Sequence, residues 1–370
     1  MSGVKRVVGV DPGTKSFDVC GLEDGRLFLD RSIPAEDISR NPQQLVELLK
    51  SSAPLDMVVG PSGYGLPWIA AKDLTPGEMD LMLLSEERDS GRKAVIGGMR
   101  DLLTLLKQSG LPVFFAPSVI HLSTVPAQRK VNRVDMGTAD KLCAVALGIR
   151  DQSMRLNIGY EETSFIYVEL GGAFSAVIAV ENGKIVDGLG GTSGPMGYLA
   201  MGAMDGELAY LLGSFNKEIL CSGGMAYVAG YPDALPEELM GTGHSADPRL
   251  GHALEAALES VVKCVCAETA IVPSPREVFI SGRLCRVQNF ASEVTRRLSR
   301  FSPVRKVGGF ARFAKEAAQG AALIADGLAG GMYEKLIDAM HLRDSRGSSL
   351  DHLFVDGAEL VKRKYLDKSV

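Results

Sequence analysis

The feature that most constrains this chain is an order of predicted elements that occurs twice. Residues 6–32 read as three β-strands, the second and third joined by the hairpin sequence Glu23-Asp24-Gly25. Residues 164–189 read the same way, with Glu181-Asn182-Gly183 at the corresponding turn. In each half, helices then alternate with strands. This order predicts a mixed sheet with helices on its faces, so the sequence predicts an α/β fold built from two similar halves.

The length of the chain supports two domains. At 370 residues it is long for a single hydrophobic core. We expect an N-terminal domain over residues 1–135, a C-terminal domain over residues 136–331 and a charged helical tail over residues 332–370. Predicted helices include residues 91–109 in the first half and the alanine-rich residues 311–328 in the second. The residues themselves hardly repeat, so the duplication is one of fold rather than of sequence.

The charge and the apolar pattern exclude several classes of protein. The formal net charge is -5, so there is no basic surplus to neutralise a nucleic-acid backbone. The most apolar stretch, residues 165–180, carries Glu169 and two glycines and is too short to span a membrane. The six cysteines form no CxxC pair, which favours reduced thiols over a metal or disulfide site. We therefore expect a cytoplasmic protein without nucleic-acid or membrane partners.

Each half opens with a strand that ends in an acidic residue and glycines. The first sequence is Asp11-Pro12-Gly13-Thr14, and the second runs from Glu169 through Gly171 and Gly172 to Ser175. Glycine lets backbone amides approach phosphate oxygens closely, and a carboxylate just before it can hold Mg²⁺ through water. Either sequence alone is also typical of an ordinary hairpin. Because both halves carry one, we expect a phosphate site, with Gly13, Thr14, Gly171, Gly172 and Ser175 on the phosphates and Asp11 and Glu169 near the metal.

These two loops resemble the phosphate motifs of the superfamily that contains acetate kinase, sugar kinases, actin and the chaperone ATPases. Residues 134–141 and 317–322 resemble its two interdomain connecting segments, and residues 278–284 resemble its adenosine motif. The resemblance implies two ribonuclease H-like, actin-like ATPase domains, each a mixed five-stranded sheet flanked by helices. It further implies that ATP and Mg²⁺ bind in the interdomain cleft, with Gly282 against the adenosine.

Within this superfamily the chain is most similar to acetate and butyrate kinases. The stretches Gly191–Gly197 and Leu199–Leu208 resemble carboxylate-kinase motifs, and the whole chain resembles a family described as predicted butyrate kinases. The resemblance implies an ATP-dependent kinase that phosphorylates a small, butyrate-like acid to an acyl phosphate. A homodimer is one assembly open to such a protein, and the sequence leaves the oligomeric state open.

Two departures from the carboxylate-kinase pattern support an alternative. The arginine that helps to hold the acyl phosphate falls at Met204, and the histidine before the second loop falls at Glu169. The alternative is a nucleotide-binding regulator, or a slow ATPase, of the same fold without kinase turnover. The ATPase activators that share an iron–sulfur cluster between subunits are disfavoured, because the chain has no suitable cysteine array.

The acceptor decides which catalytic residues are needed. A carboxylate is ionised at neutral pH and requires positive charge rather than a base. Arg129, Lys130, Arg133 and Lys141 cluster near the expected domain junction, and we expect Arg133 to bind the acid; a solvated basic loop is the other interpretation. A hydroxyl acceptor would need a base, for which Asp135 and Asp140 are candidates; their other interpretation is helix capping at the start of the connecting helix, which suits Asp135 in particular.

Two further features of the sequence lie outside these motifs. His121 follows a predicted strand, and a lone histidine in that position is more often structural than catalytic. The loop from Gly60 to Trp68 follows another strand at an edge where open sheets bind ligands, which favours a substrate pocket over a rigid turn.

Overall fold

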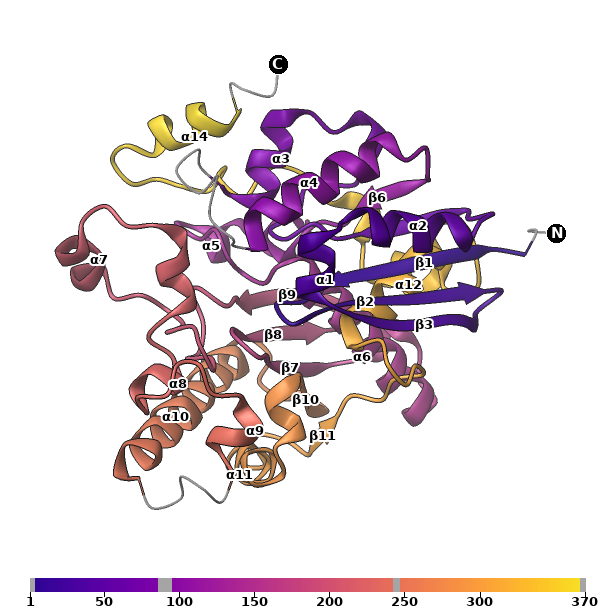
Figure 1. Cartoon of the computed structure of the whole chain (residues 1–370). Coiled ribbons are helices and arrows are strands. Elements are labelled where there is room, and N and C mark those ends of the chain that lie inside the picture. The colour runs from indigo at the N-terminus through magenta and orange to yellow at the C-terminus, as the bar shows by residue number, and fades with distance from the viewer. Residues whose placement is uncertain (1–3, 86–94, 242–246, 367–370) are drawn as a thin grey trace.

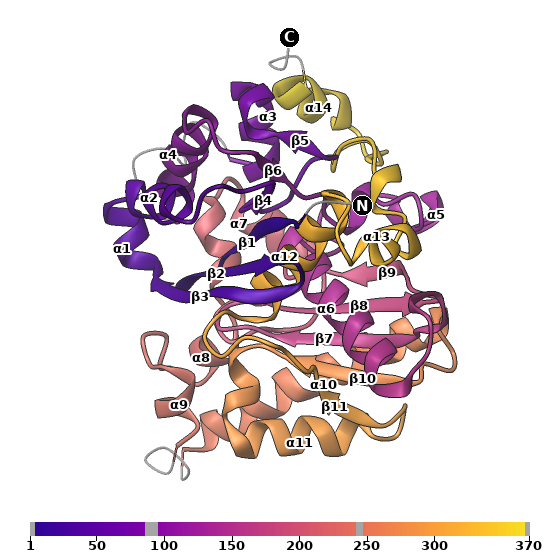
Figure 2. The same cartoon turned by 90° about the vertical axis from the view of Figure 1, so that its right-hand side faces the viewer.

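The computed structural model describes residues 4–85, 95–241 and 247–366, with the side chains of residues 95–97 left aside. It contains two mixed sheets, one from each half of the chain, with helices around them (Figures 1 and 2). The strands are β1 (Arg6–Pro12), β2 (Ser16–Glu23), β3 (Arg26–Pro34), β4 (Met57–Gly60), β5 (Ile69–Ala70), β6 (Val113–Phe115), β7 (Phe165–Leu170), β8 (Ser175–Glu181), β9 (Lys184–Leu189), β10 (Glu277–Ser281) and β11 (Val304–Lys306).

The helices cover both faces of these sheets. They are α1 (Ala35–Arg40), α2 (Gln43–Ser51), α3 (Pro76–Leu83), α4 (Val95–Gln108), α5 (Ala127–Lys130), α6 (Ala139–Leu156), α7 (Gly206–Leu212), α8 (Met225–Val228), α9 (Pro236–Leu239), α10 (Pro248–Ile271), α11 (Gln288–Leu298), α12 (Glu316–Leu328), α13 (Glu334–Ala339) and α14 (Ala358–Leu366). Within the residues described, no helix is both long and apolar enough to cross a membrane.

The two sheets share one topology, as the sequence predicts. The first has the order β3-β2-β1-β4-β6-β5 and the second has the order β11-β10-β7-β8-β9. In each, the first three strands are antiparallel and the next two join them in parallel. The α/β prediction is therefore confirmed. The first sheet has six strands rather than five, because the two-residue β5 pairs with the outer edge of β6.

One predicted helix begins later than expected. Residues 311–315 form an extended loop, and α12 starts at Glu316. The carboxylate of Asp30 on β3 accepts hydrogen bonds from the backbone N–H groups of Arg312 and Ala314, both at 2.7 Å, and from that of Phe313. This carboxylate holds amides that would otherwise begin a helix. The start of the helix predicted at residue 91 lies outside the described residues, and α4 is seen from Val95.

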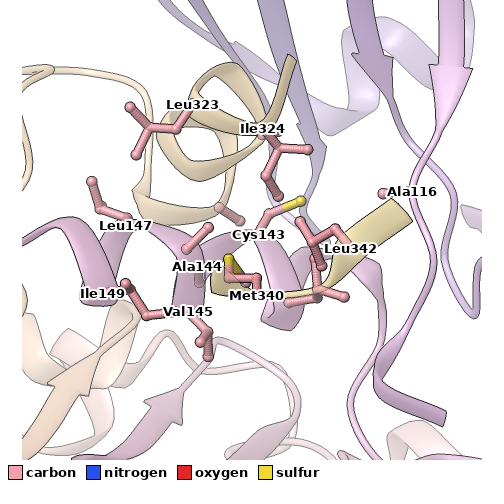
Figure 3. Close-up of a cluster of buried hydrophobic side chains, with 14 of the residues drawn as sticks. Ala116, Cys143, Ala144, Val145, Leu147, Ile149, Leu323, Ile324, Met340 and Leu342 are labelled. Atoms are coloured by element: carbon pink, nitrogen blue, oxygen red, sulfur yellow. The ribbon is translucent and has the colours of Figure 1, made fainter. Parts of the chain in front are cut away.

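Helices α6 and α12 cross between the two sheets and tie them together. A side chain at Gly320 on α12 would overlap the carbonyl of Cys143 on α6, so glycine is required for this close approach. Figure 3 shows the apolar side chains that surround the crossing, among them Leu147 of α6 and Ile324 of α12. The connecting segments predicted from sequence thus form one shared core, and this core fixes the distance between the loops at the ends of β1 and β7.

The last residues that the structure describes return to the first sheet. Leu350 and Tyr365 join the core that covers β1 and its neighbours, and α14 lies against α3. The indole Nε1 of Trp68 donates a hydrogen bond of 2.6 Å to the carbonyl of Leu342. These contacts hold the end of the Gly60–Trp68 loop against the tail.

Candidate functional site

A cavity of about 760 Å³ lies between the two halves, in the size range of small-molecule sites. Its walls come from both glycine loops, both connecting segments and the loop after β4. The lining residues fall within 10–16, 60–64, 138–144, 169–174, 191–192, 217–221, 281–286 and 315–317, together with single residues such as Leu83, Met99, Asp135 and Glu237. Segments far apart in the sequence therefore meet at one place.

The structure brings most of the predicted site residues to this cavity. Those that line it are Asp11, Gly13, Thr14, Asp135, Asp140, Glu169, Gly171, Gly172 and Gly282. Ser175 does not line it: it is the first residue of β8, fully buried, and its hydroxyl has no hydrogen-bond partner in the described part of the chain. The turn before β8, rather than the strand itself, faces the cavity.

Arg133 also stays away from the cavity. It lies in an exposed turn after α5, where its backbone N–H donates to the carbonyl of Lys130. Of the basic cluster predicted near the domain junction, only Lys141 lines the cavity. Arg129 donates instead to the carbonyl of Val186, and the buried Lys130 donates to that of Leu122. The structure therefore places Arg133 outside the cavity in which the acid was expected to contact it.

The first loop places a buried carboxylate beside a cation that is already engaged. Asp11 lies near the end of β1 and is 7% exposed. Burial raises the pKa of its carboxyl well above the ordinary value, and the charges of Asp140, Asp18 and Glu169 raise it further. The Nζ of Lys315 lies 2.9 Å from Asp18 and only partly offsets this. The loop therefore carries more negative charge than its neighbours neutralise.

The second loop pairs its carboxylate directly. The Nζ of Lys141 lies 3.0 Å from Oε1 of Glu169 and 2.5 Å from Oδ2 of Asp140. Burial lowers the pKa of Lys141, but these two carboxylates outweigh burial and raise it above its ordinary value. Burial raises the pKa of Glu169 despite this ion pair, whereas Lys141 holds the pKa of Asp140 below its ordinary value against the effect of burial. Lys141 is thus a buried cation shared by two carboxylates.

The predicted adenosine end of the cavity is formed by the turn after β10. Gly282 has a φ of +90°, and a side chain there would overlap the backbone of Leu170. The next residue, Arg283, donates two hydrogen bonds to Glu237, at 3.1 and 2.9 Å. A Cβ added at Gly172 would lie 3.3 Å from Cδ of Arg283 and would meet little else. The space above Gly172 is therefore open toward the cavity.

The two candidate bases are already occupied. The carboxylate of Asp135 accepts hydrogen bonds from the backbone and hydroxyl of Thr192, at 2.9 and 2.8 Å, and from the backbone of Gly137. Asp140 accepts a hydrogen bond from Thr138 as well as from Lys141. Asp135 therefore positions the 190–193 turn, and Asp140 holds Lys141, so neither has the free carboxylate that proton abstraction from a hydroxyl requires.

One part of the cavity wall is largely apolar. Tyr64, Leu83, Met99, Leu220 and Cys221 line it. Burial, followed by the charge of Asp135, raises the pKa of the Tyr64 phenol, so it is neutral at physiological pH. Such a pocket suits a short alkyl chain.

Lys217, from the second half of the chain, contacts the first half at this part of the cavity. Its Nζ donates to the carbonyls of Leu83 and Leu84, at 2.7 and 3.1 Å, and lies 4.6 Å from the ring centre of Tyr64. The Gly60–Tyr64 part of the predicted substrate loop therefore lines the cavity, while Trp68 does not.

His121 and Met204 have no place at the cavity. His121 is 1% exposed and accepts a hydrogen bond from the backbone N–H of Ser118 at its Nδ1, and burial lowers its pKa to about 4. It is a neutral structural residue at physiological pH. Met204 lies outside the lining.

The carboxylates fit a magnesium ion held through water. Among the residues that the structure describes, no three His, Cys, Asp or Glu side chains lie close enough to bind a metal directly. The carboxylates of Asp18, Asp140 and Glu169 nonetheless lie close enough to Asp11 to act on it electrostatically, and Mg²⁺ commonly keeps several waters while binding one or two carboxylates and the phosphates of its substrate. The water-mediated role of Asp11 and Glu169 stays a prediction.

A family model described as "Protein of unknown function (DUF1464)" matches residues 9–355. No curated protein sequence matches the chain. Similar solved structures include a propionate kinase from Francisella tularensis subsp. tularensis SCHU S4, at 13% identity and a TM-score of 0.59, covering 85% of this chain and 98% of that one. The acetate kinase of Porphyromonas gingivalis has 14% identity and a TM-score of 0.56, covering 87% and 98%. The acetate kinase of Entamoeba histolytica has 11% identity and a TM-score of 0.54, covering 80% and 86%.

At these identities the similarity establishes the fold and leaves the chemistry to the site. The predicted fold, with two mixed sheets flanked by helices, is thereby confirmed. Among the cations that line the cavity, Lys141, Lys315 and Arg283 were not assigned to the site from sequence, although Lys141 belongs to the basic cluster noted there. Each directly adjoins a predicted residue or motif (Asp140, the second connecting helix and Gly282), and that adjacency is the signal that could have identified it.

Proposed function

Because the chain belongs to the DUF1464 family of proteins of unknown function, its activity has to be inferred from the site, and we propose that it is an ATP- and Mg²⁺-dependent kinase of a small carboxylic acid. The observation that carries this proposal is the meeting of both glycine loops at one cavity with Asp11, Glu169 and Lys141. The fold shared with propionate and acetate kinases supports it.

In this proposal the cavity binds its two ligands in different parts. Gly13, Thr14, Gly171 and Gly172 approach the phosphates, and Gly282 lies against the nucleoside. Bound Mg²⁺ would offset charge on the phosphates during transfer. The acid would lie between Tyr64, Met99 and Leu220, with its carboxylate toward the phosphates.

The state of the candidate bases favours a carboxylate acceptor over a hydroxyl. Asp135 is held by Thr192 and Gly137, and Asp140 is paired with Lys141. An ionised acid needs no base: its oxygen attacks the γ-phosphorus, the bond to the bridging oxygen breaks, and ADP leaves with that electron pair. The apolar wall at Leu83, Met99 and Leu220 fits a butyrate-like chain. These features support the acid as substrate.

The position of Met204 favours a second candidate. Carboxylate kinases have an arginine in the matching motif, and here neither Met204 nor another residue of that stretch after Thr192 lines the cavity. A site without this guanidinium could bind nucleotide and hydrolyse it slowly, as a regulatory module would.

The two candidates differ in the fate of the γ-phosphate. Purified protein would be incubated with ATP, Mg²⁺ and unbranched acids of two to six carbons, and acyl phosphate trapped with hydroxylamine. The kinase predicts hydroxamate in amounts equal to the ADP formed, greatest for an acid of about four carbons. ADP and free phosphate at the same rate with and without acid would support the slow ATPase. Failure to bind ATP would overturn both.

A further inference from the structure

Lys141 lies at a position where a charged lysine is energetically unfavourable. It lies in the first turn of the 18-residue α6, whose N-terminus carries partial positive charge, and its side chain is 10% exposed. Burial also disfavours an ammonium ion. The carboxylates of Asp140 and Glu169 offset both penalties. A buried cation that is unfavourable in this way, at the place where the two loops meet, indicates a function beyond local packing.

We propose that Lys141 binds the γ-phosphate of the nucleotide and that it does so by exchanging its contact with Glu169 for the phosphate, leaving Glu169 to face the Mg²⁺ ion. The inference rests on the proposed nucleotide site and adds a phosphate-binding residue to it. In the nucleotide-free protein, Lys141 then serves as the resident counter-ion of the carboxylates that the metal later neutralises.

The charges around the cavity single out Lys141 for this exchange. Lys315 is held by the buried Asp18 and by the hydroxyl of Ser16, neither of which is a predicted metal residue. Lys217 lies at the apolar part of the wall, on the carbonyls of Leu83 and Leu84. Lys141 alone among these three is paired with a carboxylate predicted to face the metal. Mg²⁺ near Glu169 would weaken that pair by repelling the ammonium ion, which could then turn to a phosphate oxygen.

The exchange predicts opposite effects of one substitution on two ligands. Lys141→Met removes a cation that competes for Glu169, so the Kd of Mn²⁺ without nucleotide, measured by electron paramagnetic resonance, should fall about tenfold. The same change removes a contact to the γ-phosphate, so the affinity for ATP relative to ADP, measured by calorimetry with Mg²⁺, should drop about tenfold or more. Lys141→Arg keeps the charge and should keep both values nearer to those of the wild type.

Lys15→Met is the matched control. Lys15 lines the same cavity and has the same formal charge, but it is exposed and forms no ion pair with the described residues. This variant should bind Mn²⁺ as the wild type does. Because Mn²⁺ binding needs no nucleotide, it tests the competition between Lys141 and the metal for Glu169 by itself. A wild-type protein that binds no ATP would overturn the proposed function and the phosphate contact of Lys141, whereas an unchanged Mn²⁺ affinity in Lys141→Met would overturn the exchange and leave the proposed function standing.

A folded Lys141→Met protein with either an unchanged Mn²⁺ affinity or an unchanged preference for ATP over ADP would overturn the exchange. If the variant does not fold, a crystal structure of the wild-type protein with Mg²⁺ and a non-hydrolysable ATP analogue decides the question. The proposal expects Nζ of Lys141 within hydrogen-bond distance of the γ-phosphate. An ammonium still bonded to Glu169 and remote from the phosphate would contradict it.

Discussion

The loops after β1 and β7 close equivalent hairpins but neutralise their carboxylates by different means. Asp11, in the first, forms no ion pair with the residues that the structure describes, and Lys315, whose charge acts on it, is bound to Asp18. Glu169, in the second, is paired with Lys141. The first loop also presents the exposed side chains of Thr14 and Lys15 to the cavity, whereas the second presents glycines.

This difference shows how two equivalent hairpins can take different roles at one site. Both hairpins have the same place in their sheets, next to a parallel neighbour strand. The two loops differ in the helix that begins next to them. The start of α12 supplies Lys315 to the first loop, and the start of α6 supplies Lys141 to the second. In our account both loops face the metal, the first through Asp11 and the second through Glu169 once Lys141 has moved to the phosphate. The glycines of the second loop also give the phosphates close access to the backbone.

The largest effect is expected at Gly172, where the second loop depends on the absence of a side chain. Gly172→Val should lower ATP affinity at least about a hundredfold while the protein stays folded, because the new side chain fills the space meant for a phosphate and meets only Arg283 in the apo protein. Titration calorimetry and thermal unfolding would measure the two quantities. Gly251→Val on α10 is the control, since a Cβ there meets nothing within 4 Å. Normal ATP binding by the Gly172 variant would remove this loop from the nucleotide site.

The next effect concerns the metal. Removing Mg²⁺ with EDTA should weaken ATP binding by about tenfold or more, because the carboxylates of Asp11 and Glu169 then repel the phosphates without a bridging cation. Calorimetry with and without EDTA would show it. Asp11→Asn should reduce this dependence more than Lys15→Met does. Equal affinities with and without the metal would count against the role given to both carboxylates.

The comparison also predicts a pH-dependent change in stability. Burial, and then the charge of Asp140, raises the pKa of Asp11. The folded protein therefore holds this proton more tightly than the unfolded chain does, so the folded state loses stability as the pH rises through the folded-state pKa. Asp11→Asn removes that loss and should raise the melting temperature at pH 8 by a few degrees. The gain should vanish below about pH 3.5, where the carboxyl is protonated in both states.

Glu169→Gln provides the contrast in the same thermal unfolding series. Burial raises the pKa of Glu169 too, but its removal leaves Lys141 with one carboxylate instead of two. The gain at pH 8 should therefore be smaller than for Asp11→Asn, or negative. A larger gain for Glu169→Gln would mean that the second loop, not the first, carries the unbalanced charge.

The smallest effect is expected at Arg133. Its side chain is exposed and outside the cavity, so Arg133→Ala should change turnover and ATP affinity by less than about twofold, the range of a screened surface charge. Steady-state kinetics would measure both. A loss of about a hundredfold in turnover, as the sequence-based assignment of Arg133 to the acid requires, would show that the turn after α5 moves into the cleft when substrate binds.

The sequence predicted those parts of the molecule that depend on local patterns. Alternation and turn residues around Gly25 and Gly183 were enough to predict both hairpins, and the small residues around Gly320 agree with the close helix crossing. The carboxylates and glycines of both loops were predicted because they lie within a few residues of each other. Asp11 and Glu169 could thus be selected without knowledge of the tertiary structure.

The remaining parts depend on contacts between distant segments. The start of α12 was placed too early because Asp30, almost 300 residues before it in the chain, binds the amides of residues 312–314. For a similar reason, the sequence could not show that Lys141, rather than Arg133, lies at the cavity. Both lie near the domain junction in sequence, and only the position of β7 beside α6 brings Lys141 to Glu169.

The central claim is that both loops bind the phosphates of one nucleotide, and a crystal structure with Mg²⁺ and a non-hydrolysable ATP analogue tests it most directly. The account predicts the phosphates between the backbone of Gly13–Thr14 and that of Gly171–Gly172, with the nucleoside against Gly282. A nucleotide bound elsewhere, or held by one loop while the other stays remote from the phosphates, would contradict it.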